Sequence, residues 1–199
     1  MAEILYSGLS PYAAKARMAV LHVGFPATPR AVDAIDPSAA FLEANPLGKL
    51  PVLLLDDGRA IHDSRVVMRF LDLWSGGRLY PGDPEATIEV ARRESLVDGI
   101  CDCLQAIMFE KRYRPGDKIH QGWIDRQWGK ATRALAWLEA DVGGKPIEVD
   151  AGALALRGML GYLSIRFEGQ WEESCPGLAS WLVRFDEAYP ALAAAAPRL

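Results

Sequence analysis

Two short polar segments, each placed where a helix is expected to begin, are the residues of this chain best suited to chemistry. Ser10 precedes Pro11, and both residue types are favoured at a helix start. Asp63 and Ser64 precede a second apolar pattern with helical spacing. Because the first N–H groups of a helix are unpaired and the helix dipole is positive there, each segment can hold an anion. A serine hydroxyl at such a place can also stabilise a thiolate.

A proline lies between these two segments. Pro51 opens the apolar residues 52–55, which are expected to form a strand, and a proline lacks the N–H that a strand ladder needs. A cis Leu50–Pro51 bond would bend the chain and leave the N–H and C=O of Leu50 free for a peptide-like ligand. The carboxylate of Asp63 can hold an ammonium, so these residues suit an amino-acid head group. A hairpin followed by an ordinary helix cap explains the same residues without a ligand.

The elements that must position these residues alternate between strands and helices up to about residue 77. Strand–helix–strand at the start implies a parallel crossover, and a hairpin adds an antiparallel edge, which is a thioredoxin-like layout. On the first helix, Ala14, Met18 and Leu21 are expected to share the buried face. The expected elements are a strand at 3–6, a helix at 11–23 stopped by Gly24, a strand at 27–34, a short helix at about 38–42, a hairpin of 52–55 and 59–61, and a helix from 64.

The second half is expected to be entirely helical. Residues 79–84 contain two prolines, a glycine and an aspartate, and this composition is typical of a linker. Four helices are expected beyond it. The first covers 85–112, with an apolar pattern that begins at Ile88, and the second covers 118–142 and is stopped by Gly143-Gly144. The third follows a cap at Asp150, and the fourth runs from Pro176 to about 189. The helix after Asp150 is apolar nearly all round, so it should lie at the centre of the bundle. We expect domains at 1–78 and 85–199, joined by 79–84.

Three motifs occur in a fixed order along the first third of the chain. They are Ser-Pro-Tyr-Ala-Ala-Lys-Ala-Arg, then Asn-Pro-Leu-Gly-Lys-Leu-Pro-Val-Leu, then His-Asp-Ser. This ordered set resembles the glutathione S-transferase family, and in particular its bacterial serine-type members. The resemblance covers essentially the whole chain. It implies an α/β thioredoxin-like N-terminal domain that binds glutathione, plus an all-α C-terminal helical bundle that contributes the electrophile site.

The resemblance also implies a role for individual residues. Ser10 matches the catalytic serine, whose hydroxyl hydrogen-bonds the sulfur of glutathione, and Tyr6 is the rival donor. Asp98 is a weaker match to a residue that reaches the γ-glutamyl amine, in some members across a dimer. The other glutathione contacts implied are Lys49 at the glycyl end, Leu50 and Pro51 at the cysteinyl part, and Asp63 and Ser64 at the γ-glutamyl head.

The electrophile is expected to bind in an apolar site between the two halves. The candidates on family analogy are Tyr12, Met108, Phe109 and Arg112, with Tyr113 beside them. Met108 and Phe109 suit plain core packing equally well. The implied function is a glutathione transferase that activates the thiol of its cosubstrate for attack on small hydrophobic electrophiles. Two alternatives stay open: a non-catalytic or regulatory interaction module with the same fold, and a glutathione-dependent peroxidase or isomerase.

Composition excludes several other classes. The formal charge is −4, and the densest basic run, residues 111–114, has no supporting nucleic-acid motif. No apolar run approaches the ~20 residues of a membrane span, and no signal peptide is recognised, so we expect a cytoplasmic protein without a membrane partner. The three cysteines and three histidines have no metal-ligand spacing, so no metal is expected. A homodimer is expected from the family alone.

Overall fold

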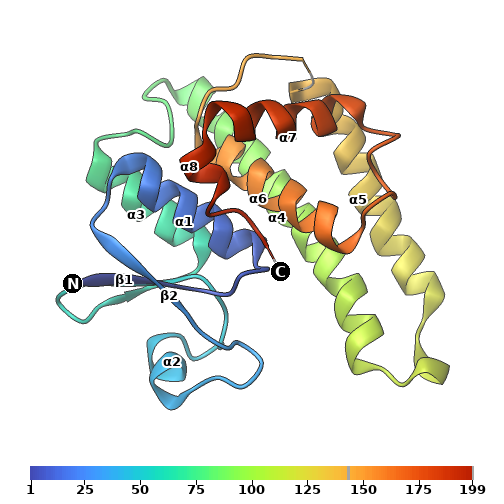
Figure 1. The fold of residues 1–199 in the computed structure, drawn as a ribbon, viewed down its shortest axis with the longest axis horizontal. Helices are drawn as coiled ribbons and strands as arrows, with labels where there is room; N and C mark the ends of the chain where they lie inside the picture. Colours follow the sequence, from blue (N-terminus) through green and yellow to red (C-terminus); the bar gives the residue numbers. More distant parts are fainter. Residues whose placement is uncertain (143, 199) are drawn as a thin grey trace.

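The N-terminal part of the chain folds around a four-stranded sheet. The computed structural model describes residues 1–142 and 144–198. β1 (Ala2–Tyr6) pairs in parallel with β2 (Ala27–Ala31) and antiparallel with β3 (Val52–Leu54), which pairs antiparallel with β4 (Ala60–Ile61). The resulting order, β2-β1-β3-β4, confirms the predicted parallel crossover and the antiparallel hairpin edge (Figure 1).

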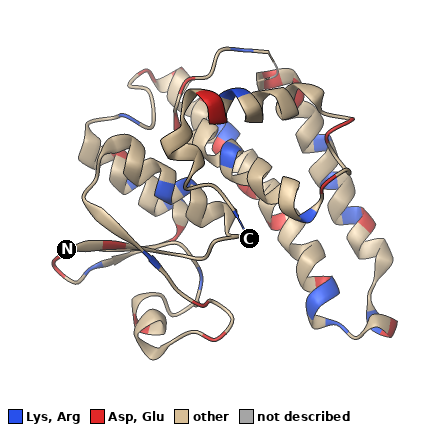
Figure 2. Cartoon of the chain, viewed as in Figure 1, with Lys and Arg blue, Asp and Glu red and all other residues tan. Residues whose placement is uncertain are grey.

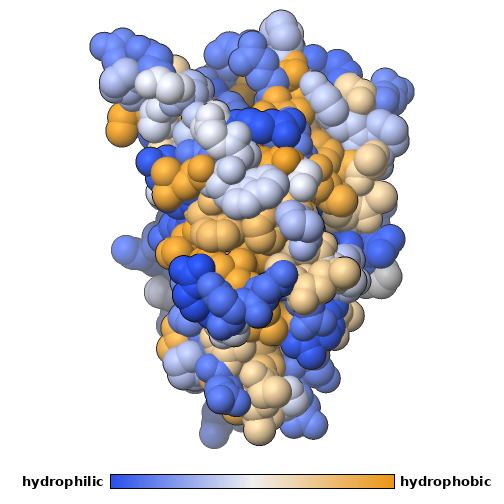
Figure 3. Space-filling view, turned by 90° about the vertical axis from the view of Figure 1, so that its left-hand side faces the viewer, coloured by the Kyte–Doolittle hydropathy of each residue, from blue (hydrophilic) through white to orange (hydrophobic). Residues whose placement is uncertain are grey.

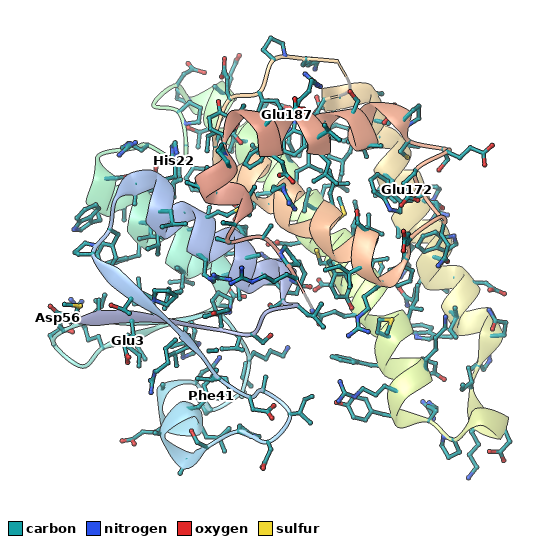
Figure 4. The ribbon with its side chains drawn as sticks, in the orientation of Figure 1. Glu3, His22, Phe41, Asp56, Glu172 and Glu187 are labelled. Atoms are coloured by element: carbon teal, nitrogen blue, oxygen red, sulfur yellow. The ribbon has the colours of Figure 1, made fainter. Side chains whose placement is uncertain are left out.

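Helices cover both faces of this sheet. α1 (Pro11–Val23) and α3 (Ser64–Ser75) lie side by side on one face, and α2 (Ala39–Ala44) lies beyond the other (Figure 1). Phe41 of α2 is buried with Leu5 and Val52 in a small core of its own (Figure 4). The chain leaves α1 at Gly24, whose positive φ of 77° is a conformation that glycine adopts without steric cost.

The second half is helical. Its elements are α4 (Pro84–Tyr113), a 3₁₀ turn (Gly116–Lys118), α5 (Gln121–Val142), α6 (Ala151–Arg166), α7 (Pro176–Ala188) and α8 (Pro190–Ala193). Every residue from 151 to 163 is buried, which confirms α6 as the central helix. Asp150 caps α6 as predicted, since its side chain accepts a hydrogen bond from the Ala153 N–H at 2.7 Å. Gly143, half of the predicted stop signal for α5, lies outside the described residues.

Two helix faces differ from the prediction. Leu21 of α1 is 53% exposed, whereas Ala14 and Met18 are buried as expected. Ile88 of α4 is 63% exposed because the buried side of that helix is formed by other residues, namely Val90, Glu94, Val97, Asp98, Ile100, Cys101, Leu104 and Ile107. The buried side of α4 includes two acids, so an apolar pattern alone placed its face wrongly.

Part of the expected linker is buried in the core. Leu79 and Tyr80 are buried, and both of their N–H groups donate to Asp72 Oδ1 at 3.0 Å. Asp72 thus fixes the chain as it leaves α3, and Arg69 balances its charge at 2.9 Å. The division into 1–78, 79–84 and 85–199 stays a prediction, with α4 beginning at Pro84.

The two halves meet where α1 crosses α6. Gly158 of α6 lies so close to α1 that a Cβ there would be 2.7 Å from the carbonyl oxygen of Pro11. The missing side chain therefore lets the first turn of α1 rest directly on the central helix. Basic and acidic residues are spread over both halves (Figure 2). None of the helices in the described ranges is long and apolar enough to cross a membrane.

Candidate active site

The sheet register brings both helix starts and Pro51 to one end of the sheet. Leu5 of β1 lies opposite Val52 of β3, and Leu53 lies opposite Ile61 of β4. Three segments therefore lie at the same end of the sheet: the loop from β1 to α1, the residue before β3 and the residues after β4. Neighbouring strands are about 4.8 Å apart, so these three segments are close enough to contact one small ligand.

Ser10 is the N-cap of α1, as predicted. Its extended backbone lets the side-chain oxygen accept a hydrogen bond from the Ala13 N–H at 3.2 Å. Because Oγ acts there as an acceptor, the hydroxyl proton stays available for another atom. The N–H of Ser10 donates to the Ser7 carbonyl at 3.2 Å, which fixes the loop before the helix. The site thus holds a partly buried hydroxyl donor at the positive end of α1.

The start of α3 is more open to an anion. Asp63 is its N-cap: a side-chain oxygen accepts from the Arg65 N–H, and its carbonyl accepts from the Val67 N–H, both at 3.0 Å. Within the described residues, the N–H groups of Ser64 and Val66 have no partner. Ser64 is 4% exposed and is the first residue of the helix, so the sequence placed the pair correctly.

The segment before β3 completes this edge. The Leu50–Pro51 bond is cis, as predicted. The N–H and C=O of Leu50 form no hydrogen bond with any residue that the structure describes. Lys49 is exposed, and its carbonyl accepts from the side-chain amide of the buried Asn45 at 2.7 Å. A ligand at this end of the sheet would meet a free backbone donor and acceptor beside an exposed cation.

One turn of α4 touches both helix starts. Asp98 accepts hydrogen bonds from Lys15 of α1 at 2.9 Å and from Arg65 of α3 at 3.2 Å. Asp102, four residues further along, accepts from the hydroxyl of Tyr12 at 2.5 Å. Residues four apart share a helix face, so α1 and α3 converge on the same side of α4.

The inner part of this junction is a buried charge cluster that the sequence did not reveal. Lys15 is 1% exposed and bonds Glu94 as well as Asp98, while Glu94 also accepts from the Tyr80 hydroxyl. Burial lowers the pKa of Lys15, but Asp98 and Glu94 more than offset this, so its pKa is raised and the ammonium stays charged. Both oxygens of Asp98 are bonded to cations of its own chain; a contact of Asp98 with a ligand stays a prediction.

Comparison with known proteins agrees with this arrangement. A family model described as the N-terminal domain of glutathione S-transferase matches residues 9–73. A glutathione S-transferase of Methylobacillus flagellatus KT, crystallised with gsh bound, is 31% identical over 100% of both chains, with a TM-score of 0.91. The chain belongs to the glutathione S-transferase family.

Other relatives agree with this family assignment. A glutathione S-transferase of Methylobacterium radiotolerans JCM 2831, in complex with glutathione sulfonate, is 32% identical with a TM-score of 0.91; the match covers 100% of this chain and 95% of that one. The uncharacterized GST-like protein YibF of Escherichia coli K12 is 31% identical over 126 residues, which are 61% of this chain and 62% of YibF. The glutathione S-transferase fold is thereby confirmed: a thioredoxin-like domain followed by a helical domain.

Apart from Tyr12 of α1, the electrophile candidates of this family member lie further along α4. Phe109 and Tyr113 follow Asp102 on the same face and are 51% and 64% exposed. They line a cavity of about 410 Å³ with Trp123 of α5, and sequence analysis did not single out Trp123 for this place. Trp123 is separated from Phe109 by the helix break, so only the turn between α4 and α5 brings them together.

The remaining candidates divide between core and surface. Met108 is partly buried and packs against the helical core, which matches the core alternative that the sequence left open. Arg112 is exposed, and its guanidinium lies 5.5 Å from the centre of the Tyr113 ring. Tyr6, the rival donor, lies inside β1 with the Arg17 guanidinium 3.8 Å above its ring centre. Their contacts with a substrate stay predictions.

The cysteines of this family member do not form part of the candidate site. Cys101 is buried, and burial raises the pKa of its thiol well above the usual value, so it stays an unreactive packing group. Cys103 is half-buried on the same helix, and burial raises the pKa of its thiol too. Over the ranges 1–142 and 144–198, no group of three His, Cys, Asp or Glu residues is placed to hold a metal ion.

Proposed function

We propose that this chain is a serine-type glutathione transferase, in which Ser10 donates a hydrogen bond to the sulfur of glutathione. The observation that carries the proposal is the free hydroxyl proton of Ser10 at the start of α1, on the same sheet edge as the open start of α3. The relatives solved with glutathione or glutathione sulfonate support the choice of ligand.

The proposed ligand matches the open groups one by one. Its γ-glutamyl head carries a carboxylate for the first turn of α3 and the Ser64 hydroxyl, and an ammonium for Asp63. Its cysteinyl part is a peptide unit, which suits the unpaired N–H and C=O of Leu50 beside Pro51. Its glycyl carboxylate suits the ammonium of Lys49. These contacts place the sulfur toward Ser10.

The reaction follows from the state of the sulfur. A free thiol has a pKa of about 8.5, so little thiolate exists at neutral pH, and only the thiolate attacks. A donor at Ser10 and the positive end of α1 stabilise the thiolate, and each unit by which they lower the pKa raises its share about tenfold. The sulfur then forms a bond to the electrophilic carbon as the leaving group departs with its electron pair.

The electrophile is proposed to bind between α1 and the far end of α4. Phe109 and Arg112 offer an exposed aromatic and an exposed cationic group, and Tyr12 and Met108 are partly buried. A small hydrophobic acceptor suits this lining. A small hydrophobic acceptor agrees with a role in detoxification. We propose this role, and a location in the cytoplasm, on the family resemblance.

A homodimer is part of the same proposal. α3 presents three apolar side chains to solvent, Val66, Leu73 and Trp74, which are 51%, 68% and 49% exposed. The face formed by the N-terminal domain shows apolar groups gathered between charged ones (Figure 3). A second copy covering this face would remove those groups from water.

Two measurements test the proposal. Titration calorimetry with glutathione should show binding at one site for each chain, and turnover of 1-chloro-2,4-dinitrobenzene should release chloride as the conjugate forms. A folded protein that binds glutathione without turnover would favour a peroxidase or isomerase. A folded protein that does not bind it at all would favour the interaction module, and the proposal would be wrong.

A further inference from the structure

The contact between Tyr12 and Asp102 joins the two domains at the mouth of the candidate site. Tyr12 is two residues beyond Ser10 on α1, and its hydroxyl donates to Asp102 Oδ1 of α4 at 2.5 Å. A helix advances about 1.5 Å per residue, so the carboxylate of Asp102 lies within a side-chain length of the start of α1. Phe109 lies seven residues beyond Asp102 on the same face of α4, so this pair lies between the start of α1 and Phe109.

The charge of Asp102 is not neutralised by its partner. Burial and the neighbouring acids raise the pKa of the Tyr12 phenol, so the phenol stays neutral and contributes only a hydrogen bond. In the part of the chain that the structure describes, no Lys or Arg nitrogen lies within 4.0 Å of the Asp102 carboxylate. Asp102 itself is exposed on the surface of α4.

The nearest cations already have acidic partners. Lys15 is bonded to Glu94 and Asp98, and Arg65 is bonded to Asp98. Arg112, the other cation proposed for the electrophile site, is ten residues from Asp102, which is about 15 Å along a helix. Among the described residues, the carboxylate of Asp102 is therefore a negative charge without an ion-pair partner at the inner end of the electrophile site, and Arg112 lies at the outer end.

We propose that Asp102 is a specificity-determining residue that makes this site accept uncharged or cationic electrophiles and discriminate against those with a carboxylate beside the reacting carbon. This inference rests on the proposed function, because it assumes that glutathione places its sulfur at Ser10. Like charges about 8 Å apart at a partly exposed site weaken binding by roughly twofold to thirtyfold.

The test uses two glutathione conjugates whose S-linked chains have the same three carbons. S-propylglutathione and S-(2-carboxyethyl)glutathione differ by a methyl group against a carboxylate, and neither has a free thiol whose ionisation could confuse the result. Titration calorimetry at low salt should give the wild type about fivefold tighter binding of the uncharged conjugate. Raising the salt concentration should narrow this ratio, because screening weakens the repulsion.

The decisive variant is Asp102→Asn, which keeps an oxygen to accept the Tyr12 hydrogen bond but removes the charge. It should bring the affinity ratio close to one, chiefly by strengthening the binding of the carboxylate conjugate. The matched control is Asp56→Asn: Asp56 is an exposed aspartate in the β3–β4 turn, beside the chain's N-terminal amine (Figure 4), at the other end of the sheet. This control should keep the wild-type ratio.

Each other outcome overturns the inference. Asp102 would not be the cause if the wild type bound both conjugates with equal affinity, or if the affinity ratio persisted in Asp102→Asn. The same conclusion would follow if Asp56→Asn abolished the ratio as well as Asp102→Asn does. In all three cases the protein still binds conjugates, so the proposed function stands. A folded chain that binds neither conjugate nor glutathione overturns the proposed function and this inference together.

Discussion

The cluster around Lys15 and the starts of α1 and α3 are adjacent polar regions with opposite designs. In the cluster, a cation that is 1% exposed is matched by Glu94 and Asp98 at 2.9 Å. At the helix starts, by contrast, the hydroxyl proton of Ser10 and the N–H of Ser64 are left without protein partners in the described chain. Polar groups that are fully paired within the protein hold its elements together, whereas unpaired polar groups can bind a ligand. Substitutions should therefore separate stability from affinity.

The largest effect is expected for Lys15→Met, which leaves the buried Glu94 without a cation and the buried Asp98 with Arg65 alone. Breaking such a buried pair costs about 3–5 kcal/mol in the free energy of unfolding. Urea denaturation measures this loss, with the exposed Lys130→Met as the control that should change little. If Lys15→Met cost less than about 1 kcal/mol, the cluster would not differ in kind from a surface ion pair.

The next effect concerns the open side. Ser10→Ala should lower kcat/KM for 1-chloro-2,4-dinitrobenzene by about 10- to 100-fold, the value of a hydrogen bond to a charged atom, while glutathione affinity changes much less. Ser38→Ala is the matched control, because Ser38 caps α2 through the Phe41 N–H just as Ser10 caps α1. Both variants should lose about 1 kcal/mol of stability, but only Ser10→Ala should lose turnover. Wild-type turnover in Ser10→Ala would move the role to Tyr6.

A smaller effect is expected for Ser64→Ala. It should weaken glutathione binding about tenfold in calorimetry, because the ligand carboxylate loses one donor of several. Ser75→Ala, at the far end of the same helix, removes a hydroxyl that bonds the Asp72 carbonyl and should leave the affinity unchanged. Equal affinities in both variants would contradict the head-group assignment.

The smallest effect is expected where the closed and open regions meet. Arg65 bonds Asp98 of the cluster but is 58% exposed on the first turn of α3. Arg65→Met should cost no more than about 1 kcal/mol of stability, since exposed ion pairs contribute little. It should weaken glutathione binding about twofold to threefold at low salt, as a cation near the ligand carboxylate is lost. If Arg65→Met lost as much stability as Lys15→Met, Arg65 would belong to the stabilising cluster, and the two regions would not be distinct.

The two regions also differ in how far the sequence predicted them. The caps at Ser10 and Asp63, the stop at Gly24 and the bend at Pro51 depend on residues a few positions apart, so local rules found them. Lys15 was missed because its partners, Glu94 and Asp98, are 79 and 83 residues away. No local pattern distinguishes it from an exposed lysine.

The same reason explains the misplaced faces. Leu21 and Ile88 are apolar residues at helical spacing, yet both are exposed because the neighbouring elements pack against other sides of α1 and α4. Trp123 could be placed beside Phe109 only once the turn between α4 and α5 was known. Tertiary contacts between distant segments decided each case.

The close approach of Gly158 to Pro11 ties the start of α1 to the deepest helix of the molecule. At the outer ends of α4 and α5, by contrast, Phe109, Tyr113 and Trp123 are exposed. In the proposed function, substitutions at the acceptor end could therefore alter the choice of substrate without moving the start of α1, which is proposed to hold the sulfur.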